Sequence, residues 1–472
     1  MTSTIKNNVR APLAMRRIVQ TWWPLAVSWL LMAVEGPTMS AVVARLADPE
    51  IHLAAWGGIV WALALLLESP IIMLLSASTA LSKDWDSYRK LRRFMMVAGA
   101  VLTVLHVLIA FTPLYYVVAV EMIGAPAEII EPGRVGMMIM LPWTWAIAYR
   151  RFNQGVMIRF GQSRAVGLGT VVRLGADGIV LAIGYLIGTV PGIIVATCAI
   201  TTGVVTEALY VGLRVRPVLR GPLREAAPVE QPLTLRSFLE FYIPLAITAL
   251  LSMLALPMIS AALSRMPRAV DSLASWSVVS GFVFMLRSMS YAFNEVVIAL
   301  LDEPHATRRL RGFAIWLAAL TSGALLTIAA TPLATFWFGR VLALNPRLVA
   351  MARIGLWVAL PVPGSNVFLS WYQGTMVHSR RTRAITEAVA VFLLAGGVVL
   401  WTGVAWGQMT GLYVGIASLG SGMLAQTFWL WRRSRPTMRA LRVCDEASRV
   451  RDEASQVRDE ALFAVQASLG QE

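Results

Sequence analysis

Residues 24–46 read PLAVSWLLMAVEGPTMSAVVARL and residues 244–266 read PLAITALLSMLALPMISAALSRM, so the two segments align without a gap at an offset of 220. After one shift, an offset of 219 holds from LRRF (91–94) against LRGF (310–313) to the Arg-Pro pairs at 216 and 435. It also matches QGVM (154–157) with QGTM (373–376). A chance match would not keep register over this length, so we predict one structural unit in two copies.

Both copies consist mainly of long apolar runs. Hydrophobic residues make up 57% of the 472 positions and charged residues 14%, with a mean hydropathy of +0.66, which is typical of an integral membrane protein. A run of about 20 apolar residues crosses the hydrocarbon core as a helix. Twelve spans are predicted, at residues 20–44, 52–80, 94–119, 135–158, 165–188, 191–213, 239–263, 272–300, 312–337, 348–372, 384–405 and 408–431.

The runs are continuous rather than alternating, which favours helices over a β-barrel, because lipid leaves no backbone group without an internal partner. We therefore expect an all-α multi-pass membrane protein with two six-helix lobes. Because each lobe has an even number of spans, both lobes have the same orientation and form a parallel repeat.

The net charge of +15 is distributed unevenly along the chain. Lysine and arginine cluster before the first span and after every even-numbered span, so the positive-inside rule predicts that both termini are cytoplasmic. These cations lie at helix ends, so we expect contact with the lipid bilayer and not with nucleic acid. We predict the cell membrane, or the inner membrane of a bacterium, as the location. The polar N-terminus predicts no cleaved signal peptide.

The domain boundaries follow from the repeat and from changes in composition. We predict a cytoplasmic N-terminus at 1–19, an N-lobe at 20–217, a cytoplasmic linker rich in proline and charge at 218–239, a C-lobe at 240–436 and a cytoplasmic tail at 437–472. In the tail, VCDEASR, VRDEASQ and VRDEALF (443–463) repeat every seven residues. This pattern predicts an amphipathic helix that self-associates weakly as a coiled coil.

Two six-helix lobes in parallel repeat resemble the multidrug and toxic compound extrusion (MATE) transporters and the wider superfamily that includes polysaccharide and lipid flippases. Within it, TWWPLA at 21, LPVPGSN at 360 and LYVGIASLGSGMLA at 412 are most similar to the progressive ankylosis proteins. The resemblance covers residues 20–436 and implies export by alternating access. It also implies proton or sodium coupling at an acidic residue of the first helix, and for the ankylosis branch anionic cargo such as citrate, ATP or pyrophosphate.

Several charges inside the predicted spans occur in only one copy. A charge near the bilayer centre costs on the order of 3 kcal/mol, so each of these side chains should face a partner or water. Aligned with an uncharged residue of the other copy are Glu35, Glu68, Arg173, Asp177, Glu207, Arg287 and Glu295. We interpret these positions as candidates for a site off the repeat axis, because residues that maintain the fold should recur.

Ion coupling is assigned to three of the carboxyl groups. Glu35 begins Glu35-Gly36-Pro37 and Glu68 begins Glu68-Ser69-Pro70, so each carboxylate adjoins a carbonyl that proline leaves unpaired. Two carboxylates in one low-dielectric cavity suit proton binding and release. Asp177 is the third candidate, since it could exchange protons with them. The alternative is that these groups only bond to neighbouring helices.

Substrate binding is assigned to five residues. Arg173 is four residues from Asp177, so the two can pair across one helical turn. That pair either neutralises itself or faces the cavity and exchanges partners during transport. Arg287, Tyr291 and Asn294 share one helical face with Glu295 at its edge, and a guanidinium grips a carboxylate or phosphate through two bonds. In the tenth span, Asn366, Ser370 and Gln373 form either a similar polar stripe or a packing face.

The predicted function is secondary active export of small organic or phosphorylated anions by alternating access of the two lobes. The alternatives are a proton- or sodium-coupled multidrug antiporter, a flippase for a lipid-linked precursor, and a non-transporting membrane scaffold. The seven buried charges sum to −3, which favours cationic cargo, whereas the resemblance favours anions. The sequence contains no nucleotide loop, metal motif or nucleophilic arrangement, so we expect neither an enzyme nor a cofactor beyond a coupling ion.

Overall fold

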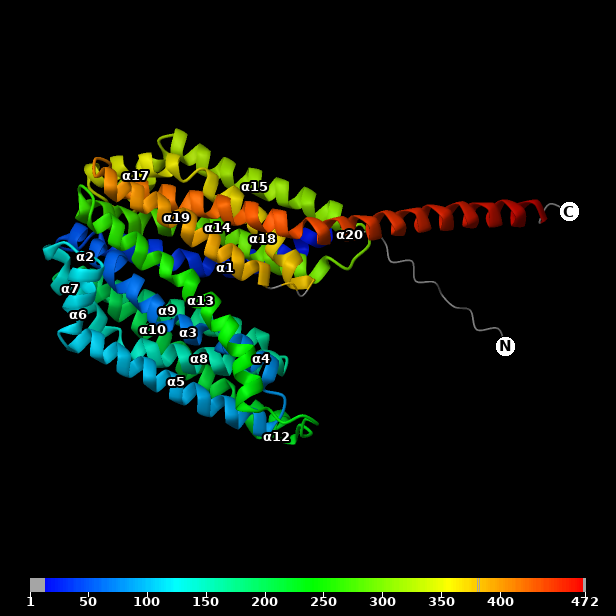
Figure 1. Ribbon diagram of the computed structural model, residues 1–472, viewed down its shortest axis with the longest axis horizontal. Coiled ribbons are helices and arrows are strands. Elements are labelled where there is room, and N and C mark those ends of the chain that lie inside the picture. The colour runs from blue at the N-terminus through cyan, green and yellow to red at the C-terminus, as the bar shows by residue number, and fades with distance from the viewer. Residues whose placement is uncertain (1–12, 380, 382, 470–472) are drawn as a thin grey trace.

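The computed structural model describes residues 13–379, 381 and 383–469, and these residues form helices and no strand (Figure 1). The first half of the chain contains α1 (Met15–Val43), α2 (Pro49–Ala55), η1 (Trp56–Val60), α3 (Trp61–Ile72), α4 (Leu74–Leu81), α5 (Trp85–Phe111), α6 (Leu114–Tyr116), η2 (Val117–Met122), α7 (Ala127–Ile139), α8 (Leu141–Arg159), α9 (Ser163–Ile187) and α10 (Gly192–Arg214). Two short linker helices follow, α11 (Arg216–Arg220) and α12 (Pro222–Glu225). The second half contains α13 (Leu235–Ser264), α14 (Ala269–Leu300), α15 (Ala306–Ala330), α16 (Leu333–Thr335), η3 (Phe336–Val341), α17 (Pro346–Val358), α18 (Pro361–His378), α19 (Arg383–Trp406) and α20 (Gly411–Leu469).

Nine helices in the described part of the chain are long and apolar enough to cross a membrane, and the bent pair α17 and α18 makes ten. The chain is therefore a multi-pass membrane protein. The other two predicted spans, 135–158 and 408–431, coincide with α7 to α8 and with the start of α20. Charged side chains such as Arg134 and Arg150, and the glycines and serines of α20, keep these segments below the hydropathy of the rest.

Prolines modify several predicted spans in the same way in both halves. The spans expected to reach 119 and 337 end at Phe111 and Ala330, because Pro113 and Pro332 follow and α-helix is disfavoured before proline. The spans starting at 135 and 348 are each interrupted, since α8 and α18 begin at new helix starts carrying Pro142 and Pro361. The bend between α17 and α18 is 44°. Proline therefore interrupts helices at equivalent places in the two halves.

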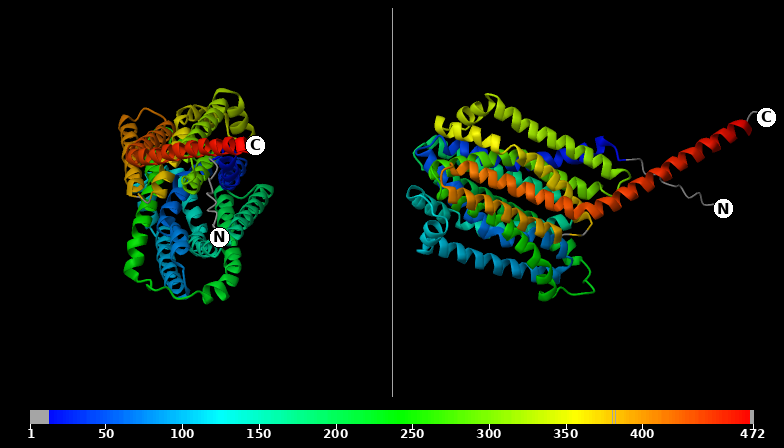
Figure 2. Two further views of the ribbon diagram at one scale, coloured as in Figure 1. Left: turned by 90° about the vertical axis from the view of Figure 1, so that its right-hand side faces the viewer. Right: turned by 45° about the horizontal axis from the view of Figure 1, so that its top comes forward.

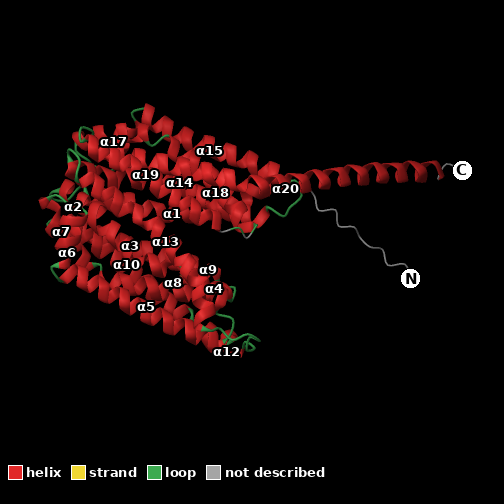
Figure 3. Ribbon diagram, in the orientation of Figure 1, coloured by secondary structure: helices red, strands yellow, loops and turns green. Residues whose placement is uncertain are grey.

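The two halves converge at one end and diverge at the other. Helices α2, α7 and α17 mark the converging end, and α4, α12 and the extension of α20 mark the diverging end (Figure 1). Loops concentrate at these two ends, as Figure 3 shows. The described parts of the segments predicted to be cytoplasmic lie at the diverging end (Figure 1). There, α20 continues beyond the bundle as a helix to Leu469 (Figure 2), whereas the side chains of the heptad seam, from Cys444 onward, lie outside the described side chains.

Helices α1 and α13 each cross from one half of the molecule to the other. At the start of α1, Trp22 donates from Nε1 to the carbonyl oxygen of Met289 in α14 at 3.0 Å and packs on Phe313 of α15. At the start of α13, Tyr242 donates to the carbonyl of Pro70 in α3 and packs on Phe94 of α5. Trp22 and Tyr242 are 220 residues apart, which is the offset of the repeat. The first part of each helix therefore lies on the opposite lobe.

Two arginines join the lobes at the converging end. Arg45, just after α1, donates from Nη2 to the carbonyls of Arg340 and Val341 in η3, at 3.2 and 2.9 Å. Arg265, just after α13, donates to the carbonyls of residues 121, 122 and 123 at the end of η2, at 2.7 to 3.2 Å. A π-helical turn leaves its last carbonyls without intrahelical donors, and a guanidinium satisfies them. We call this pair of contacts the arginine latch.

Glycines at equivalent positions allow close helix packing within each lobe. Gly155 of α8 lies against Leu75 and Ser78 of α4, where a Cβ would overlap the carbonyl of Leu75. Its counterpart, Gly374 of α18, lies against α14, where a Cβ would come within 2.9 Å of Val297 and 3.0 Å of the Asn294 carbonyl. The Gln-Gly motif shared by the two copies therefore marks a helix crossing that admits no side chain.

We predict that Gly155→Ala and Gly374→Ala each destabilise the protein, by about 1–3 kcal/mol, because the added methyl group meets backbone atoms that cannot move independently. The control is Gly323→Ala in α15, where nothing lies within 4 Å of the new Cβ and the helix should gain about 0.5–1 kcal/mol. Thermal unfolding of the purified protein in detergent measures all three. Equal melting temperatures for the three variants would contradict this packing argument.

Candidate functional site

Seven charged side chains from five helices gather inside the N-lobe. We call them the N-lobe charge network: Glu35 (α1), Glu68 (α3), Arg150 and Arg151 (α8), Arg173 and Asp177 (α9), and Glu207 (α10). Most of these residues are less than a tenth exposed, with Glu207 at 1%. Because charges in such surroundings require compensation, the network decides how the five helices pack.

Glu207 is the centre of the network. Its Oε2 accepts a hydrogen bond from Arg150 and lies 3.7 Å from Nε of Arg173, while its Oε1 accepts from Nε2 of Gln154 at 2.9 Å. Arg173 in turn forms an ion pair with Glu35, with 2.8 Å between Nη2 and Oε2. A continuous chain of charge contacts therefore runs from α8 through α10 and α9 to α1.

The expected pairing of Arg173 with Asp177 across one turn is wrong. Arg173 turns toward Glu35 and Glu207, and no salt bridge joins it to Asp177 among the described residues. Both carboxyl oxygens of Asp177 are buried and receive no hydrogen bond from a donor in that part of the chain, and the carboxyl group of Asp177 faces that of Glu35. The interpretation of a self-neutralising pair is therefore excluded, because Arg173 uses carboxylates from two other helices.

The structure brings the three predicted ion-coupling residues together. Asp177 lies near Glu35, and Glu68 lies near Arg150 and Arg151 with its Oε2 buried and unpaired among the described atoms. Four carboxyl groups thus face three guanidinium groups. One negative charge remains when all ionise, so the uptake of a single proton makes the network neutral.

Sequence reasoning missed both arginines of α8. It assigned Arg150 and Arg151 to the cluster of cations after the fourth span, whereas Arg150 is 5% exposed inside the helix and bound to Glu207. The comparison of the two copies that identified the carboxylates would also have identified these arginines, since their counterparts in the second copy are the uncharged Leu369 and Ser370. Glu207 was noted as a difference between the copies but was given no role.

Arg173 is the one predicted substrate residue in the N-lobe. The other four lie on α14 in the C-lobe. Arg287 donates from Nη2 to the hydroxyl of Tyr291 at 3.0 Å and reaches Oδ1 of Asn366 at 3.5 Å. It forms no salt bridge with a described residue, and its buried Nε has no partner there. A half-buried guanidinium without a carboxylate is therefore available to an anion.

Two of the polar positions are structural. Asn294 donates to the carbonyl of Ser370 at 3.2 Å, and Asn366 donates to the carbonyl of Arg287 at 3.3 Å, so both amides tie α14 to α18. The polar stripe of the tenth span therefore serves as a packing face at Asn366 and Ser370. The predicted contact of Asn294 with substrate, together with Arg287 and Tyr291, stays a prediction.

Helix α1 also contacts Tyr291 and Glu295 of α14 in the C-lobe. Trp29 packs on the ring of Tyr291 with 5.1 Å between centroids and donates from Nε1 to Oε1 of Glu295 at 3.4 Å. Glu35 lies about 9 Å further along the same helix at 1.5 Å per residue. One helix therefore connects the N-lobe charge network with the arginine and carboxylate of α14.

Metal ligands do not cluster in the described residues, where no group of three or more histidine, cysteine, aspartate and glutamate side chains could hold an ion. Within the N-lobe charge network, guanidinium groups form ion pairs with Glu35 and Glu207. What this arrangement can do chemically is take up and release protons and exchange ion-pair partners.

We predict that Glu207→Gln and Asp177→Asn differ sharply in stability, although each removes one buried carboxylate. Losing Glu207 leaves Arg150 and Arg173 undercompensated and should lower stability by about 3–5 kcal/mol. Asp177 has no ion-pair partner among the described residues, so its replacement by asparagine should change stability by less than about 1 kcal/mol. Thermal unfolding in detergent measures both. Similar losses for the two variants would mean that Asp177 is also a structural ion.

No family model matches the chain, and no curated protein matches it. Among solved structures, it is similar to the lipid II flippase MurJ in an inward closed conformation, with a TM-score of 0.69 and 12% identity over 90% of each chain. It is similar to an inward-facing multidrug resistance MATE family transporter of the MOP superfamily, with a TM-score of 0.62 and 13% identity over 90% of this chain and 99% of that one.

A third similar structure is a MOP superfamily transporter from Pyrococcus furiosus, described as having a reverse polarity of its binding pocket that suggests a different function. Its TM-score is 0.62, with 15% identity over 92% of this chain and 98% of that one. These alignments span nearly the whole of each chain. The chain therefore has the all-helical, roughly twelve-span fold of MATE transporters and of the MOP superfamily.

Proposed function

We propose that the protein is a secondary active exporter that works by alternating access, with proton binding in the N-lobe charge network driving the movement of the two lobes. The observation that carries this proposal is the position of α1. The helix holds Glu35 in the network and contacts α14 and α15 of the opposite lobe through Trp22 and Trp29. A change in charge at Glu35 therefore acts on the interface between the lobes.

The coupling step is a loss of attraction. When the network takes up a proton at Asp177 or Glu35, the negative charge that holds Arg173 decreases, and Arg173 can turn fully to Glu207. The second half of α1 is then released from α9, and Pro37 provides a break at which the helix bends. The first half stays on the C-lobe, so bending α1 changes the angle between the lobes.

We assign small organic or phosphorylated anions as the cargo. Arg287 is the support for this assignment, because its guanidinium has only the neutral partners Tyr291 and Asn366 among the described residues. Sodium is the alternative coupling ion. A cation-coupled multidrug antiporter is the second candidate, favoured by the excess negative charge of the N-lobe charge network. Similarity to MurJ keeps a flippase as the third, and an enzyme is not proposed.

We predict that Glu35→Gln abolishes the dependence of export on a proton gradient while leaving the protein folded, because the amide cannot release a proton. Reconstituted vesicles preloaded with citrate, pyrophosphate or ATP, with and without a pH gradient, measure the effect. We expect gradient-driven flux to fall by about tenfold or more, a range typical of losing one proton-transfer group.

The matched control is Glu240→Gln, an exposed carboxylate on α13 paired with Arg236. It should transport like the parent. Unchanged gradient dependence in Glu35→Gln would eliminate Glu35 as the coupling site. If the parent transports a lipophilic cation but none of the anions, the multidrug antiporter is the function. If it transports no solute, the non-transporting membrane scaffold is the remaining function.

The arginine latch accounts for closure at the converging end. Both contacts bridge the lobes, and they must break if that end opens during transport. We predict that the double variant Arg45→Ala, Arg265→Ala shifts the population toward the state open at that end. Each charge-assisted contact contributes about 1 kcal/mol, so the loss of both should shift the population by about thirtyfold.

Spin labels test this shift on the background Cys198→Ser, Cys444→Ser. Placed at Ala47→Cys in the N-lobe and Ala350→Cys in the C-lobe, two exposed positions near the latch, they report the distance between the lobes. The latch variant should gain a longer-distance population, and Arg16→Ala at the opposite end should not. An identical distance distribution in parent and variant would show that the latch does not hold the lobes together.

A further inference from the structure

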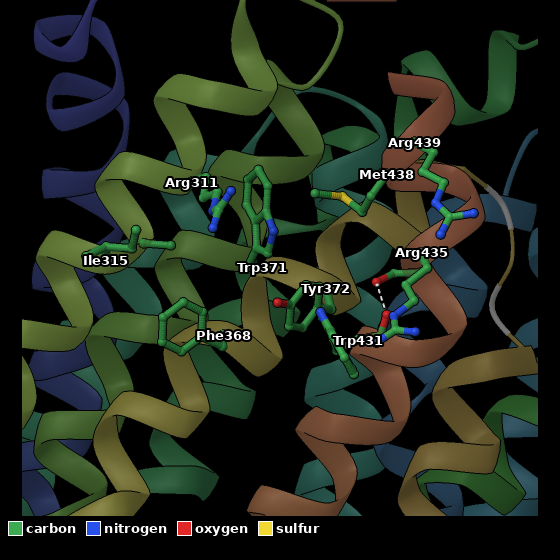
Figure 4. Close-up of a pocket in the computed structure, with 11 residues that line it drawn as sticks. Arg311, Ile315, Phe368, Trp371, Tyr372, Trp431, Arg435, Met438 and Arg439 are labelled. Carbon is green, nitrogen blue, oxygen red and sulfur yellow. Dashed lines mark hydrogen bonds between the residues drawn. The ribbon is translucent and has the colours of Figure 1, made fainter. Parts of the chain in front are cut away.

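A pocket of about 390 Å³ lies in the C-lobe at the diverging end, outside the interface between the lobes described above. Three helices form its walls, α15, α18 and α20 (Figure 4). Its lining combines the arginines 311, 435 and 439 with the aromatic residues Phe368, Trp371, Tyr372 and Trp431. We call it the C-lobe pocket. Neither export nor proton coupling uses any of these side chains.

The three arginines of the C-lobe pocket lack countercharges. Arg311, Arg435 and Arg439 form no salt bridge with any side chain that the structure describes. The guanidinium of Arg435 stacks on the ring of Trp431, with 3.6 Å from Cζ to the ring centroid, which fixes the arginine without neutralising it. Arg435 and Arg439 are one turn apart on α20, and Arg311 extends from the opposite wall beside Trp371 (Figure 4). The pocket is therefore built for an anion.

The surroundings of the pocket indicate a lipid rather than a soluble anion. Leu424, Phe428 and Trp431 follow one another along a face of α20 and are 36 to 59% exposed, and Ile315 at the pocket wall is 52% exposed. These apolar side chains continue from the pocket toward the middle of the predicted spans, where acyl chains run. Tryptophan and tyrosine with arginine are typical of the level at which lipid headgroups lie.

We propose that the C-lobe pocket binds the phosphate headgroup of an anionic phospholipid, with the acyl chains lying along the exposed face of α20 and Ile315. Basic pockets between membrane helices on the cytoplasmic side bind anionic headgroups in this way. A volume of about 390 Å³ is within the range of sites that hold a small ligand. A phospholipid headgroup and free phosphate share the same phosphate group, so free phosphate is the alternative occupant of the C-lobe pocket.

The repeat provides an internal control for this site. The three arginines align at an offset of 219 with Arg92, Arg216 and Arg220 of the N-lobe, all of them exposed at the same end of the molecule. There the counterpart of Trp431 is Gly212, and Tyr149 packs directly against it. In addition, α10 ends at Arg214, whereas α20 continues through Pro436, so Arg435 and Arg439 of the C-lobe pocket lie on one continuous helix. The equivalent region of the N-lobe therefore has the same three arginines but not the tryptophan and the continuous helix that form the pocket wall in the C-lobe.

Binding of phosphatidylglycerol to the full-length protein in detergent, measured by native mass spectrometry, tests the proposal. The triple variant Arg311→Gln, Arg435→Gln, Arg439→Gln should bind this lipid at least about tenfold more weakly than the parent, since each arginine near a headgroup contributes substantially. The control Arg92→Gln, Arg216→Gln, Arg220→Gln removes the same three charges and should stay within about twofold of the parent. Phosphatidylcholine should bind equally to all three proteins.

Two results would overturn the proposal. Equal loss of phosphatidylglycerol from both triple variants would mean that the lipid responds to overall charge and not to the C-lobe pocket. Displacement of the lipid by millimolar inorganic phosphate or glycerol phosphate would identify a soluble anion as the occupant. Because all six arginines are exposed, folding should survive, and Trp431→Leu, which leaves every charge in place, provides a second variant that should weaken lipid binding.

Discussion

A buried charge inside a membrane-spanning bundle must be compensated, and in this protein the compensation of Glu207 organises the N-lobe. Its carboxylate accepts from α8 at Arg150 and Gln154 and faces α9 at Arg173, so three helices share one anion. Arg173 extends the same compensation to Glu35 on α1. Removing Glu207 or Arg173 leaves another ion uncompensated in a low-dielectric interior, which is why these helices cannot be repositioned independently.

The exchange of α1 and α13 between the lobes gives this local chemistry a long-range effect. Each helix begins on the opposite lobe and ends in its own, with Trp22 and Tyr242 as the equivalent anchors. The latch arginines follow directly at the other ends of the same two helices, so both helices are held at each end by contacts to the other lobe. A bend in the middle of α1 therefore changes the relation of one lobe to the other.

The two copies share a backbone plan but differ in their side chains. Glycine and proline recur, at positions 155 and 374 and at 142 and 361, because the crossings and kinks that they permit are needed in both lobes. The charged residues inside the spans differ between the copies, which leaves the N-lobe with an ionisable interior and the C-lobe with Arg287, whereas the three arginines of the C-lobe pocket have counterparts in the N-lobe. Repetition of a fold thus provides two scaffolds, and divergence gives each a separate site.

How much the sequence predicted depends on whether an effect is local. Hydropathy and the offset of the repeat reflect residues near one another in the chain, so the spans and the all-helical fold could be predicted directly. The charges that differ between the copies identified Glu35, Glu68 and Asp177, because burying an ion is costly wherever it pairs. Helix geometry likewise predicted the contact of Arg287 with Tyr291, four residues apart.

The partner of each charge depends on the packing of the helices. Arg173 and Asp177 share a helical face, yet Arg173 pairs with carboxylates from α1 and α10, because helix packing brings Glu35 and Glu207 within reach of its guanidinium. The sequence pattern places Arg150 among the cations at a helix end, whereas in the fold it pairs with Glu207 of α10. Composition and the repeat were enough to predict that the spans exist, occur in two copies and contain unbalanced charges. The packing of helices distant in the chain determined how those charges are balanced, since ion pairs depend on distances that no single helix sets.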